Sequence, residues 1–422
     1  MFNFVAVPIL SVLFYLFYLV SCSFQLNRSV YIGFIFYDEL SMFMVFMTCF
    51  VIFISFIFCI RLVSSELSFV LLVMLVVCCL VFTTNNMFMF YLFYEASLIP
   101  ILYIIIKWGS YPERSIRSIM LLLYTSIFTF PFVYILFRFY NTNNSLVFSL
   151  FYGVNGLRRT LVFSVLIFFT FAVKLPIYGL HFWLPMAHVE APTFGSMILA
   201  GILLKLGGVG LIRFSSLLNL GELKSSVLAY FFVFLVYVTL VCCFQSDFKR
   251  LVAYSSVSHM ITIPIMLLSS TYVGLKGVIR VIFLHGIRSP LIFILVGVIY
   301  LFISTRQHLL MRGVLCFRPI LSFLIVLAFF FTLSAPPFPS FVAEVLFSFS
   351  RVRLWYPRLV FLLLFLFLSI VYNLLWLTSS VFLNQDSSVN YSFLFSYSYF
   401  IPIFLSIFVM PVLFTIFFFN VL

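Results

Sequence analysis

The stretch from Ala172 to Gly208 reads AVKLPIYGLHFWLPMAHVEAPTFGSMILAGILLKLGG. Lys174 stands inside an apolar segment and is followed at once by Leu175 and Pro176. Trp183-Leu184-Pro185 forms a second interruption, and a new apolar run then carries Lys205 well away from either end. A charge at that depth in an apolar segment costs free energy, so each lysine needs a structural or functional reason.

The composition of the whole chain excludes a soluble domain. Hydrophobic residues make up 65% of the 422 residues, and charged residues make up only 8%. No soluble protein of this length could hide so much apolar surface from water. The apolar residues come in runs of roughly 20, the length with which a helix spans a bilayer core. The sequence therefore predicts an all-α, polytopic membrane protein.

Short polar breaks divide the chain into about thirteen apolar segments of transmembrane length. The narrowest break is Thr83-Thr84-Asn85-Asn86. Lysine and arginine residues are spread nearly evenly over the two sets of alternating loops, so the positive-inside rule leaves the orientation open. The segments fall near 2–21, 37–61, 68–84, 86–106, 116–139, 160–184, 192–213, 226–244, 248–270, 274–303, 314–350, 357–383 and 394–420.

Two of these segments are interrupted by proline. Lys174-Leu175-Pro176 interrupts segment 160–184, which Pro185 is expected to break again, and Ser334–Pro339 interrupts segment 314–350. Proline removes helix hydrogen bonds, and in a membrane the freed carbonyls must be satisfied by protein or water. Two such segments about five segments apart are typical of inverted-repeat transporters, whose functional site lies near the breaks. For either segment alone, an ordinary proline kink is the alternative.

We expect a single transmembrane domain over residues 1–422 with four parts. Residues 1–85 would form peripheral N-terminal helices, 86–213 a first half, 226–383 a second half and 394–420 a C-terminal helix. The N-terminus lacks a charged leader and a small-residue cleavage site, so we expect it to be retained as the first helix.

Four ionisable residues fall well inside the predicted helices: Glu95, Lys174, Lys205 and Glu344. A buried ion pair that fixes helix packing is the structural alternative for each, but such pairs are at best modestly stabilising. A chain of titratable groups near mid-membrane is what proton transfer requires, and a buried lysine can release its proton and recover it. The residue chemistry therefore favours proton transfer over packing.

Three histidines are further candidates for the proton path. His181 follows Lys174 at a spacing that would put both side chains on one helix face if the helix continued. His259 and His285 each fall within an apolar segment, where a hydrogen-bonded packing role is an equal alternative. We therefore place all three on the candidate path behind the four charged residues.

Other polar positions near these segments have simpler explanations. His188 and Glu190 lie at a connection between segments, where protons would enter or leave. Arg288 lies close to the middle of segment 274–303 and must therefore be paired or face a wet cavity. Gly207-Gly208-Val209-Gly210 lies inside a membrane helix, the wrong context for phosphate binding, and more simply permits close helix approach.

The sequence also excludes several kinds of site. The eight cysteines include no Cys-x-x-Cys and no Cys/His ligand spacing, so we expect no metal, no iron–sulfur cluster and no disulfide. No glycine-rich nucleotide-binding motif is present, which predicts no cofactor and no redox centre in this chain. The net charge of +13 is spread over short loops rather than one basic face, which argues against nucleic-acid binding.

Several motifs of the chain match one family as a set. They are Val173–Pro176, Gly179–Pro192, Leu203–Gly208, Tyr94–Pro100, Trp108-Gly109, Pro112–Arg114, Asp247–Lys249, Ala253–Met260, His285-Gly286, and Pro336-Pro337 followed by Glu344. In these motifs the chain resembles the mitochondrially encoded chain 4 family of NADH:ubiquinone oxidoreductase, respiratory complex I. The resemblance covers roughly Asp38 to Glu344, and Val189-Glu190 favours the mitochondrial type.

The resemblance implies an antiporter-like membrane protein with inverted repeats and two Pro-broken helices. Such a subunit belongs to the membrane arm and moves protons while NADH is oxidised and quinone is reduced elsewhere in the complex. It implies a multi-pass protein of the mitochondrial inner membrane. Its partners would be the other membrane-arm subunits, including neighbouring antiporter-like chains, and phospholipids.

The resemblance also implies roles for the matching residues. Glu95 would pair with Lys174, Lys174 and Lys205 would carry the proton along the midplane, and Glu344 would end the path. His259 and His285 fall on the connecting hydrophilic axis of the family. The chain departs from the family before Glu95, where it is shorter by about one helix, and at Ile287–Pro290, which replaces a small, polar pattern. The loop Ser304–His308 is also reduced.

Two other functions share parts of this pattern. A subunit of an Mrp-type Na⁺/H⁺ antiporter would have the same broken helices and lysines. A non-transporting scaffold that only bridges membrane subunits would need neither lysine for its function. Finding NADH dehydrogenase activity and flavin in the same particle would favour complex I over the antiporter. Replacing Lys174 or Lys205 would test the scaffold, which predicts that pumping stays intact.

Overall fold

The computed structural model describes most of the chain. The described residues are 30–32, 35–59, 64–109, 111–148, 161–218, 220–221, 223–303, 306–307, 319–336, 338–350, 356–382, 402–404 and 407. The predicted segment 2–21, most of 394–420 and most of the loop Ser304–His308 lie outside them. The chain divides into two compact units, Met1–Leu223 and Lys224–Leu422.

The described residues form a helical membrane protein. Nine of their helices are long and apolar enough to cross a membrane, and three shorter apolar helices accompany them. Each predicted segment from 37–61 to 357–383 contains a helix. The predicted all-α, polytopic class is therefore confirmed. A short antiparallel hairpin that the sequence did not predict, β1 (Val30–Ile32) and β2 (Ile35–Tyr37), precedes the first described helix.

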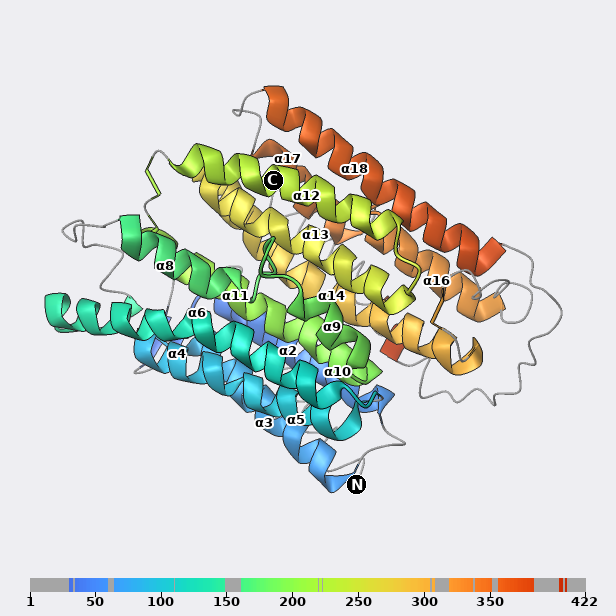
Figure 1. Ribbon diagram of the computed structural model, residues 1–422, viewed down its shortest axis with the longest axis horizontal. Coiled ribbons are helices and arrows are strands. Elements are labelled where there is room, and N and C mark those ends of the chain that lie inside the picture. Colours follow the sequence, from blue (N-terminus) through green and yellow to red (C-terminus); the bar gives the residue numbers. More distant parts are fainter. Residues whose placement is uncertain are drawn as a thin grey trace. The chain divides into compact units, whose positions relative to one another are not determined.

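The helices of the first unit run lengthwise beside one another (Figure 1). A π-helical turn, η1, and a 3₁₀ turn, η2, interrupt and follow the last of them. In chain order the elements are α2 (Glu39–Phe58), α3 (Ser65–Thr83), α4 (Met87–Ala96), α5 (Leu98–Trp108), α6 (Arg114–Asn143), α8 (Leu161–Ala172), α9 (Trp183–Glu190), α10 (Thr193–Ile198), η1 (Leu199–Leu203), α11 (Leu204–Arg213) and η2 (Ser215–Leu217).

Short polar residues at the segment boundaries start these helices. Asp38 caps α2, because its Oδ1 accepts from the Ser41 backbone N–H at 2.8 Å while the Ser41 hydroxyl accepts from the Asp38 N–H. Ser64 caps α3, and Asn86 caps α4 by accepting from the Phe88 N–H at 2.9 Å. The narrow break at Asn85-Asn86 is therefore a real helix boundary, as predicted.

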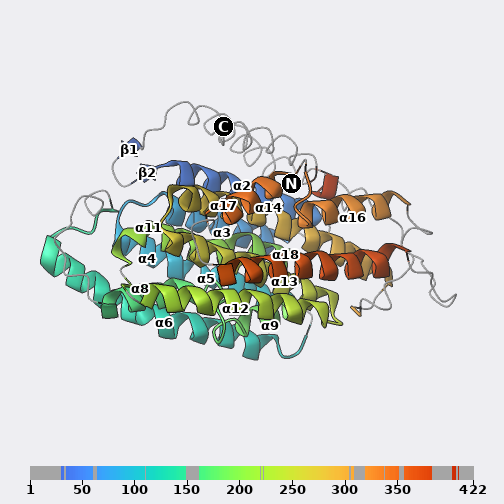
Figure 2. The same ribbon diagram turned by 90° about the horizontal axis from the view of Figure 1, so that it is seen from above.

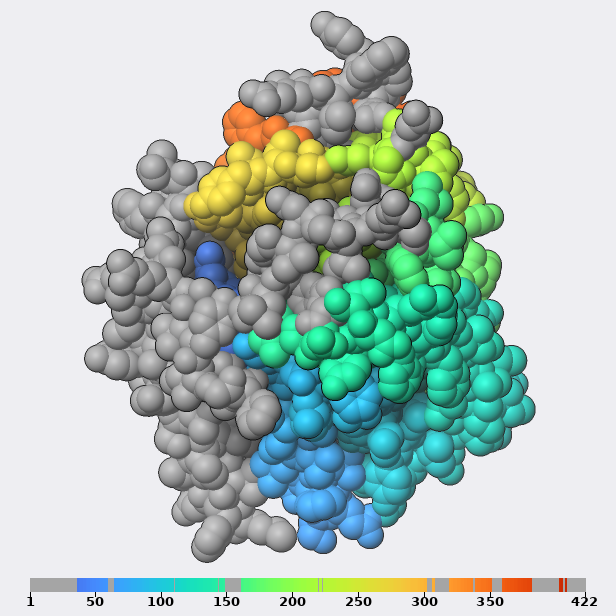
Figure 3. All heavy atoms as spheres, turned by 90° about the vertical axis from the view of Figure 1, so that its left-hand side faces the viewer, coloured from blue at the N-terminus to red at the C-terminus, as the bar shows by residue number. Residues whose placement is uncertain are grey.

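Burial in the first unit follows the apolar pattern of each helix. In α2 every residue from Leu40 to Phe58 is buried, which suits a helix that is apolar all round. The helix α6 instead exposes large apolar side chains, among them Ile116, Ile127 and Phe130. In the space-filling view α3 to α6, coloured blue to teal, form an outer surface (Figure 3). In a membrane protein such an apolar surface contacts lipid or a neighbouring membrane subunit.

The second unit contains longer helices, which also run lengthwise beside one another (Figures 1 and 2). The helix α14 packs against both α13 and α17. The elements are α12 (Leu223–Cys243), α13 (Phe248–Ser269), α14 (Tyr272–Ile303), α16 (Pro319–Thr332), α17 (Pro339–Phe349), α18 (Tyr356–Leu377) and a π-helical turn, η3 (Thr378–Phe382).

The first predicted break lies where the sequence placed it. The helix α8 ends at Ala172, and α9 begins only at Trp183. The indole Nε1–H of Trp183 donates to the Val173 carbonyl at 3.1 Å, which satisfies an acceptor that the helix no longer uses. The predicted second interruption at Pro185 is wrong, because Pro185 is the third residue of α9, where a missing N–H breaks no helix bond. The next interruption is Ala191-Pro192, between α9 and α10.

The second predicted break separates α16 from α17. Ser334 there has φ 53°, a left-handed conformation that ends a helical run. The Ser340 hydroxyl of α17 donates to the Phe331 carbonyl at 3.1 Å. Both breaks are therefore built alike, since a side chain after the break satisfies a carbonyl before it. The two broken helices of the predicted fold are confirmed.

Candidate functional site

Lys174 lies in the break between α8 and α9 and is fully buried, with 0% exposure. Its Nζ donates to the backbone carbonyl of Tyr94 at 2.9 Å. The same Nζ stands 3.3 Å from the centroid of the Tyr94 ring, a cation–π contact away from water. Tyr94, a residue of α4, is thus the main partner of Lys174.

The partner carbonyl is available because a helix breaks there too. The helix α4 ends at Ala96 and α5 begins at Leu98, so the Tyr94 carbonyl lies in the last turn of α4, where carbonyls have no partner within the helix. The Tyr94 carbonyl accepts from the Ser97 hydroxyl at 2.7 Å as well as from Lys174. The sequence predicted one segment over 86–106, so it predicted neither this junction nor the contact of Lys174 with Tyr94.

Glu95 lies beside this contact at the end of α4. Its carboxylate interacts electrostatically with Lys174, as does Cys78 of α3. Among the described residues, however, Glu95 and Lys174 form no ion pair within 4.0 Å. The Glu95 Oε1 is buried and accepts no hydrogen bond from the described part of the chain. The structure thus places the two charges near each other, and their pairing in function stays a prediction.

Lys205 is the second fully buried lysine, with 0% exposure. It is the second residue of α11 and follows the π-helical turn η1, whose Ala200 carbonyl accepts a hydrogen bond from Lys205 Nζ. A π-turn leaves the regular helix hydrogen-bond pattern and often marks a functional site. The sequence placed Lys205 in the right segment but carried no signal for this turn.

Small residues bring α11 close to α8. A Cβ at Gly207 would lie 2.9 Å from the Phe171 carbonyl oxygen, and a Cβ at Gly210 would overlap the Phe171 ring. The predicted close approach at Gly207–Gly210 is therefore confirmed. Phe171 and Lys174 stand on the same turn leading into the break, so this contact sets the position of the Lys174 backbone.

His181 and its neighbours do not continue the helix that carries Lys174. Because α8 ends at Ala172, the condition for a shared helix face is not met, and His181 lies in the connection beside the Phe182 ring. The His188 side chain is fully buried in α9. Glu190, only 3% exposed, accepts from Arg117 Nε at 2.7 Å in an ion pair that joins α9 to α6. Glu190 is thus a buried, paired charge at the end of α9.

Arg213, the last residue of α11, is also buried, with 3% exposure. Its Nη2 donates to the Phe82 carbonyl at 2.7 Å and lies 3.6 Å from Asp38 Oδ1. This arginine therefore ties the C-terminal end of α11 to α3 and to the N-terminus of α2. Its position at a predicted segment end hid this role in the sequence.

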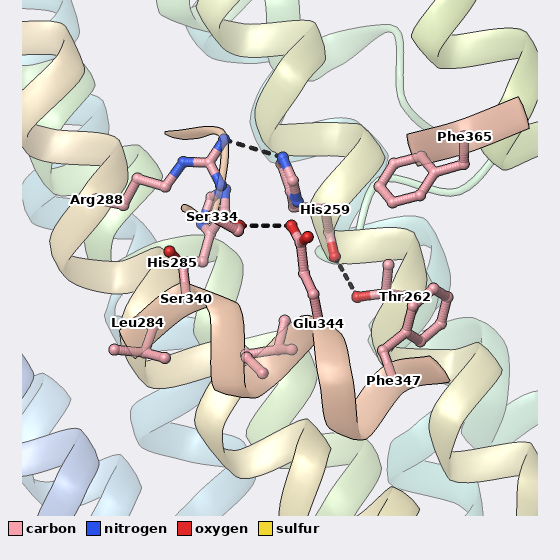
Figure 4. Close-up of a pocket in the computed structure, with 12 residues that line it drawn as sticks. His259, Thr262, Leu284, His285, Arg288, Ser334, Ser340, Glu344, Phe347 and Phe365 are labelled. Carbon is pink, nitrogen blue, oxygen red and sulfur yellow. Dashed lines mark hydrogen bonds between the residues drawn. The ribbon is translucent and has the colours of Figure 1, made fainter. Parts of the chain in front are cut away.

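The second unit gathers its candidate residues around one cavity. The cavity measures about 40 Å³ and is lined by residues of α13, α14, α17 and α18 (Figure 4). One water needs about 10–15 Å³ of such volume, so the cavity has room for a few waters. Its polar lining consists of His259, Thr262, His285, Arg288, Ser334, Ser340 and Glu344.

Glu344 enters this cavity from α17. Its Oε1 accepts from the Ser334 hydroxyl at 2.6 Å, so the residue with left-handed φ in the break holds the carboxylate (Figure 4). His259 and His285 also line the cavity, and the centroids of their rings lie 6.1 Å apart. The second break thus positions Glu344 directly, while the histidines come from the neighbouring α13 and α14.

Arg288 is the residue whose place the sequence left open. It is buried, with 6% exposure, and one of its Nη atoms lies 3.0 Å from His259 Nε2 (Figure 4). Its guanidinium also interacts electrostatically with Glu344 and with Tyr372 of α18. Arg288 is therefore paired with His259 and faces a cavity with room for water, as the sequence required. Tyr372, fully buried at 1% exposure, was missed because it is an ordinary aromatic residue in an apolar run.

The structure therefore assembles two sites, one in each unit. In the first unit it brings Glu95, Tyr94 and Lys174 together. In the second it brings His259, His285, Arg288 and Glu344 together. Both stand at a broken helix, and both hold buried titratable side chains next to freed backbone groups. These features define a polytopic membrane protein of the antiporter-like class.

Comparison with known proteins gives the family. The family model described as NADH:quinone oxidoreductase/Mrp antiporter, TM, matches residues 84–371. NADH-ubiquinone oxidoreductase chain 4 of Ceratitis capitata is 37% identical over 311 residues, which cover 72% of this chain and 69% of that protein. The same protein of Locusta migratoria is 36% identical over 299 residues, 69% of this chain and 66% of its own length. The chain belongs to the NADH:quinone oxidoreductase/Mrp antiporter membrane family.

Solved structures share the fold. A chain of respiratory complex I from Thermus thermophilus superposes with a TM-score of 0.85 at 20% identity, covering 96% of this chain and 89% of that one. A chain of the Mrp complex from Dietzia sp. DQ12-45-1b gives a TM-score of 0.80 at 15% identity, covering 92% and 78%. The predicted antiporter-like fold and the resemblance to chain 4 are therefore confirmed.

Proposed function

We propose that this chain is a proton-translocating subunit of the membrane arm of NADH:ubiquinone oxidoreductase, respiratory complex I, in the mitochondrial inner membrane. It works beside neighbouring antiporter-like chains and phospholipids. NADH oxidation and quinone reduction take place in other subunits, and this chain contributes proton movement without a cofactor or redox centre of its own. The similarity of this chain to NADH-ubiquinone oxidoreductase chain 4 of Ceratitis capitata and Locusta migratoria supports this assignment.

One observation carries the proposal. Lys174 and Lys205 are both fully buried, and each donates to a backbone carbonyl, those of Tyr94 and Ala200. A buried ion pair that loses one charge leaves the other uncompensated at a cost of several kcal/mol. A carbonyl is neutral, and a neutral amine still has hydrogens to donate to it. Each lysine can therefore give up its proton and keep its hydrogen bond, which suits a carrier rather than a packing residue.

The path that we propose follows the buried groups in order. Glu95 modulates the charge on Lys174, and Lys174 and Lys205 pass the proton along the membrane. Glu344 ends the path, with His259 and His285 as intermediate stations. His181 stays a lower candidate, because it does not continue the helix before Lys174 and lies in the connection next to the Phe182 ring.

Replacing the lysines tests the proposal. Lys174→Met and Lys205→Met remove the titratable amine and keep an unbranched side chain of similar length. We expect assembled complexes that oxidise NADH and reduce quinone with greatly reduced proton pumping, measured by acidification of sealed vesicles. Lys107→Met is the matched control, because Lys107 is exposed and paired with Glu66 on the surface. Normal pumping in both buried-lysine variants would leave only the scaffold function.

Glu95→Gln tests the proposed modulation of Lys174. The amide keeps the size of the side chain and removes its charge, so we expect normal assembly and impaired proton transfer. An unchanged ratio of protons pumped to NADH oxidised would contradict the role of Glu95.

An Mrp-type Na⁺/H⁺ antiporter subunit is the second candidate, favoured by the TM-score of 0.80 to the Dietzia complex. Gentle purification of the particle that contains this chain separates the two. Flavin and NADH dehydrogenase activity in the same particle support complex I. A particle without either, and with Na⁺-dependent proton exchange, supports the antiporter.

A further inference from the structure

Arg288 lines the cavity of the second unit, and the proposed path gives it no role. It stands in the middle of α14, is buried, and reaches across the cavity to α13 (Figure 4). A guanidinium is always charged and can only donate hydrogen bonds. Placing such a group between titratable residues is costly unless its charge is used.

The contact with His259 determines the state of that histidine. Because Arg288 can only donate, His259 Nε2 must accept the hydrogen bond of 3.0 Å. His259 is therefore neutral in this structure, with its hydrogen on Nδ1. A proton that arrives at Nε2 removes the acceptor and places a second positive charge next to the guanidinium. Arg288 must then leave His259.

Glu344 is the second acceptor within the same cavity. Its carboxylate is held by Ser334 through Oε1 and interacts electrostatically with Arg288, but the two make no ion pair within 4.0 Å among the described residues. The cavity between them has a volume of about 40 Å³, which leaves room for a side chain to move. The other titratable groups facing Arg288 and His259 are His285 of α14 and Tyr372 of α18.

We propose that Arg288 is a positioning residue that couples proton transfer at His259 to proton transfer at Glu344. When His259 is neutral, Arg288 donates to His259 Nε2. When His259 takes a proton, Arg288 moves to the Glu344 carboxylate and favours its ionised form. A proton that arrives at one station thus promotes release from the other, and no bond other than those to the transferred protons is made or broken. This inference rests on the proton path proposed above.

Single replacements in the assembled complex test the coupling. Arg288→Gln removes the charge, and Arg288→Lys keeps a cation that can still donate to His259. Proton pumping and NADH oxidation are measured together in sealed vesicles over a series of pH values. We expect Arg288→Gln to lower pumping roughly tenfold or more, the factor that one lost hydrogen bond to a charged group represents. It should also displace the pH profile by about one unit or more, while Arg288→Lys keeps the wild-type profile.

A double replacement separates positioning from structure. If Arg288 acts through His259, then Arg288→Gln adds little to the pumping defect of His259→Asn. Arg280→Gln is the matched control, because Arg280 is equally buried on the same helix but does not line the cavity. That variant should change stability without displacing the pH profile. A wild-type pH profile in Arg288→Gln, or independent effects of the two replacements, would overturn the proposal.

Two further results keep the test decisive. If Arg288→Gln does not assemble, His259→Gln answers the same question, since the amide oxygen still accepts from Arg288 but takes up no proton. Its pumping should lose the pH dependence that the pair confers, and a wild-type profile would again overturn the coupling. The variants Lys174→Met and Lys205→Met distinguish a failure of the proposed proton path from a failure of the proposed role of Arg288. Normal pumping in both lysine variants would contradict the proton path itself. Loss of pumping in them, together with normal pumping and a wild-type pH profile in Arg288→Gln, would contradict only the role of Arg288.

Discussion

Gly210→Ala is the replacement whose effect the structure determines most directly. A Cβ at this position of α11 would overlap Cδ1 and Cε1 of the Phe171 ring and lie 3.0 Å from its Cγ. Phe171 has little room to move, because its ring stacks on Phe214 at 5.2 Å and meets the edge of Phe132 at 5.5 Å. It is also 2% exposed, with Tyr94 packed against it at 5.8 Å.

The expected loss follows from this crowding. Adding a methyl group to a packed core that cannot relax costs typically about 1–3 kcal/mol. For a unit of about 200 residues, each kcal/mol lowers the melting temperature by roughly 2–4 °C. We therefore expect Gly210→Ala to lower the melting temperature of the assembled complex by about 2–12 °C. Since Tyr94 is the partner of Lys174, proton pumping should fall as well.

Thermal unfolding of the purified complex, followed with a thiol-reactive dye, measures this loss. Gly277→Ala is the control, because its Cβ would meet the flexible Met266 Sδ at 3.0 Å and Leu346 Cβ at 3.4 Å. It should cost well under the loss at Gly210. Phe171→Leu in the Gly210→Ala background should recover part of the stability, with a coupling of about 0.5–3 kcal/mol. Wild-type stability in Gly210→Ala, or no coupling to Phe171, would refute the packing argument.

Three further predictions concern individual contacts. Tyr94→Phe should pump normally because it keeps the ring below Lys174, whereas Tyr94→Leu should pump poorly because it loses a cation–π contact of roughly 2 kcal/mol; vesicle acidification compares them. Arg117→Gln should destabilise the complex by about 1–3 kcal/mol or more, since it leaves Glu190 buried and unpaired, and adding Glu190→Gln should restore stability in thermal unfolding. Asp38→Ala should cost about 1 kcal/mol more than Asp38→Asn, because only asparagine still caps α2; equal losses would show that the cap contributes nothing.

The broken helices show which helix interruptions can be predicted from the positions of proline in the sequence. Pro176 and the Pro336-Pro337 pair indicated where two helices stop, because proline removes a hydrogen bond wherever it stands inside a helix. The same reasoning failed at Pro185, since the first turn of a helix tolerates proline and only the actual start of α9 at Trp183 says which turn that is. The π-turn before Lys205 was not predicted, because its residues, Leu199–Leu203, are apolar like those of the helix around it.

The hydrogen-bond and ion-pair partners of the charged residues were harder to predict from the sequence than their depth in the membrane segments. Glu95 and Lys174 were expected to pair, yet the nearest acceptor for Lys174 is the Tyr94 carbonyl, which is exposed by the junction of α4 and α5. Any backbone carbonyl can accept a hydrogen bond, so sequence patterns do not distinguish one from another. Arg213 and Glu190 each stand at the end of a helix, yet both are buried and paired with residues of other helices or their caps, which the sequence did not predict.

The sequence by itself determined the class of protein, the positions of its helices and the burial of its lysines. These follow from local properties, namely apolar length, proline positions and the cost of a charge in hydrocarbon. Only the tertiary structure decided which groups face each other: Tyr94 beneath Lys174, and Arg288 between His259 and Glu344. Such contacts join residues far apart in the chain, so they depend on how helices pack, which no local pattern encodes.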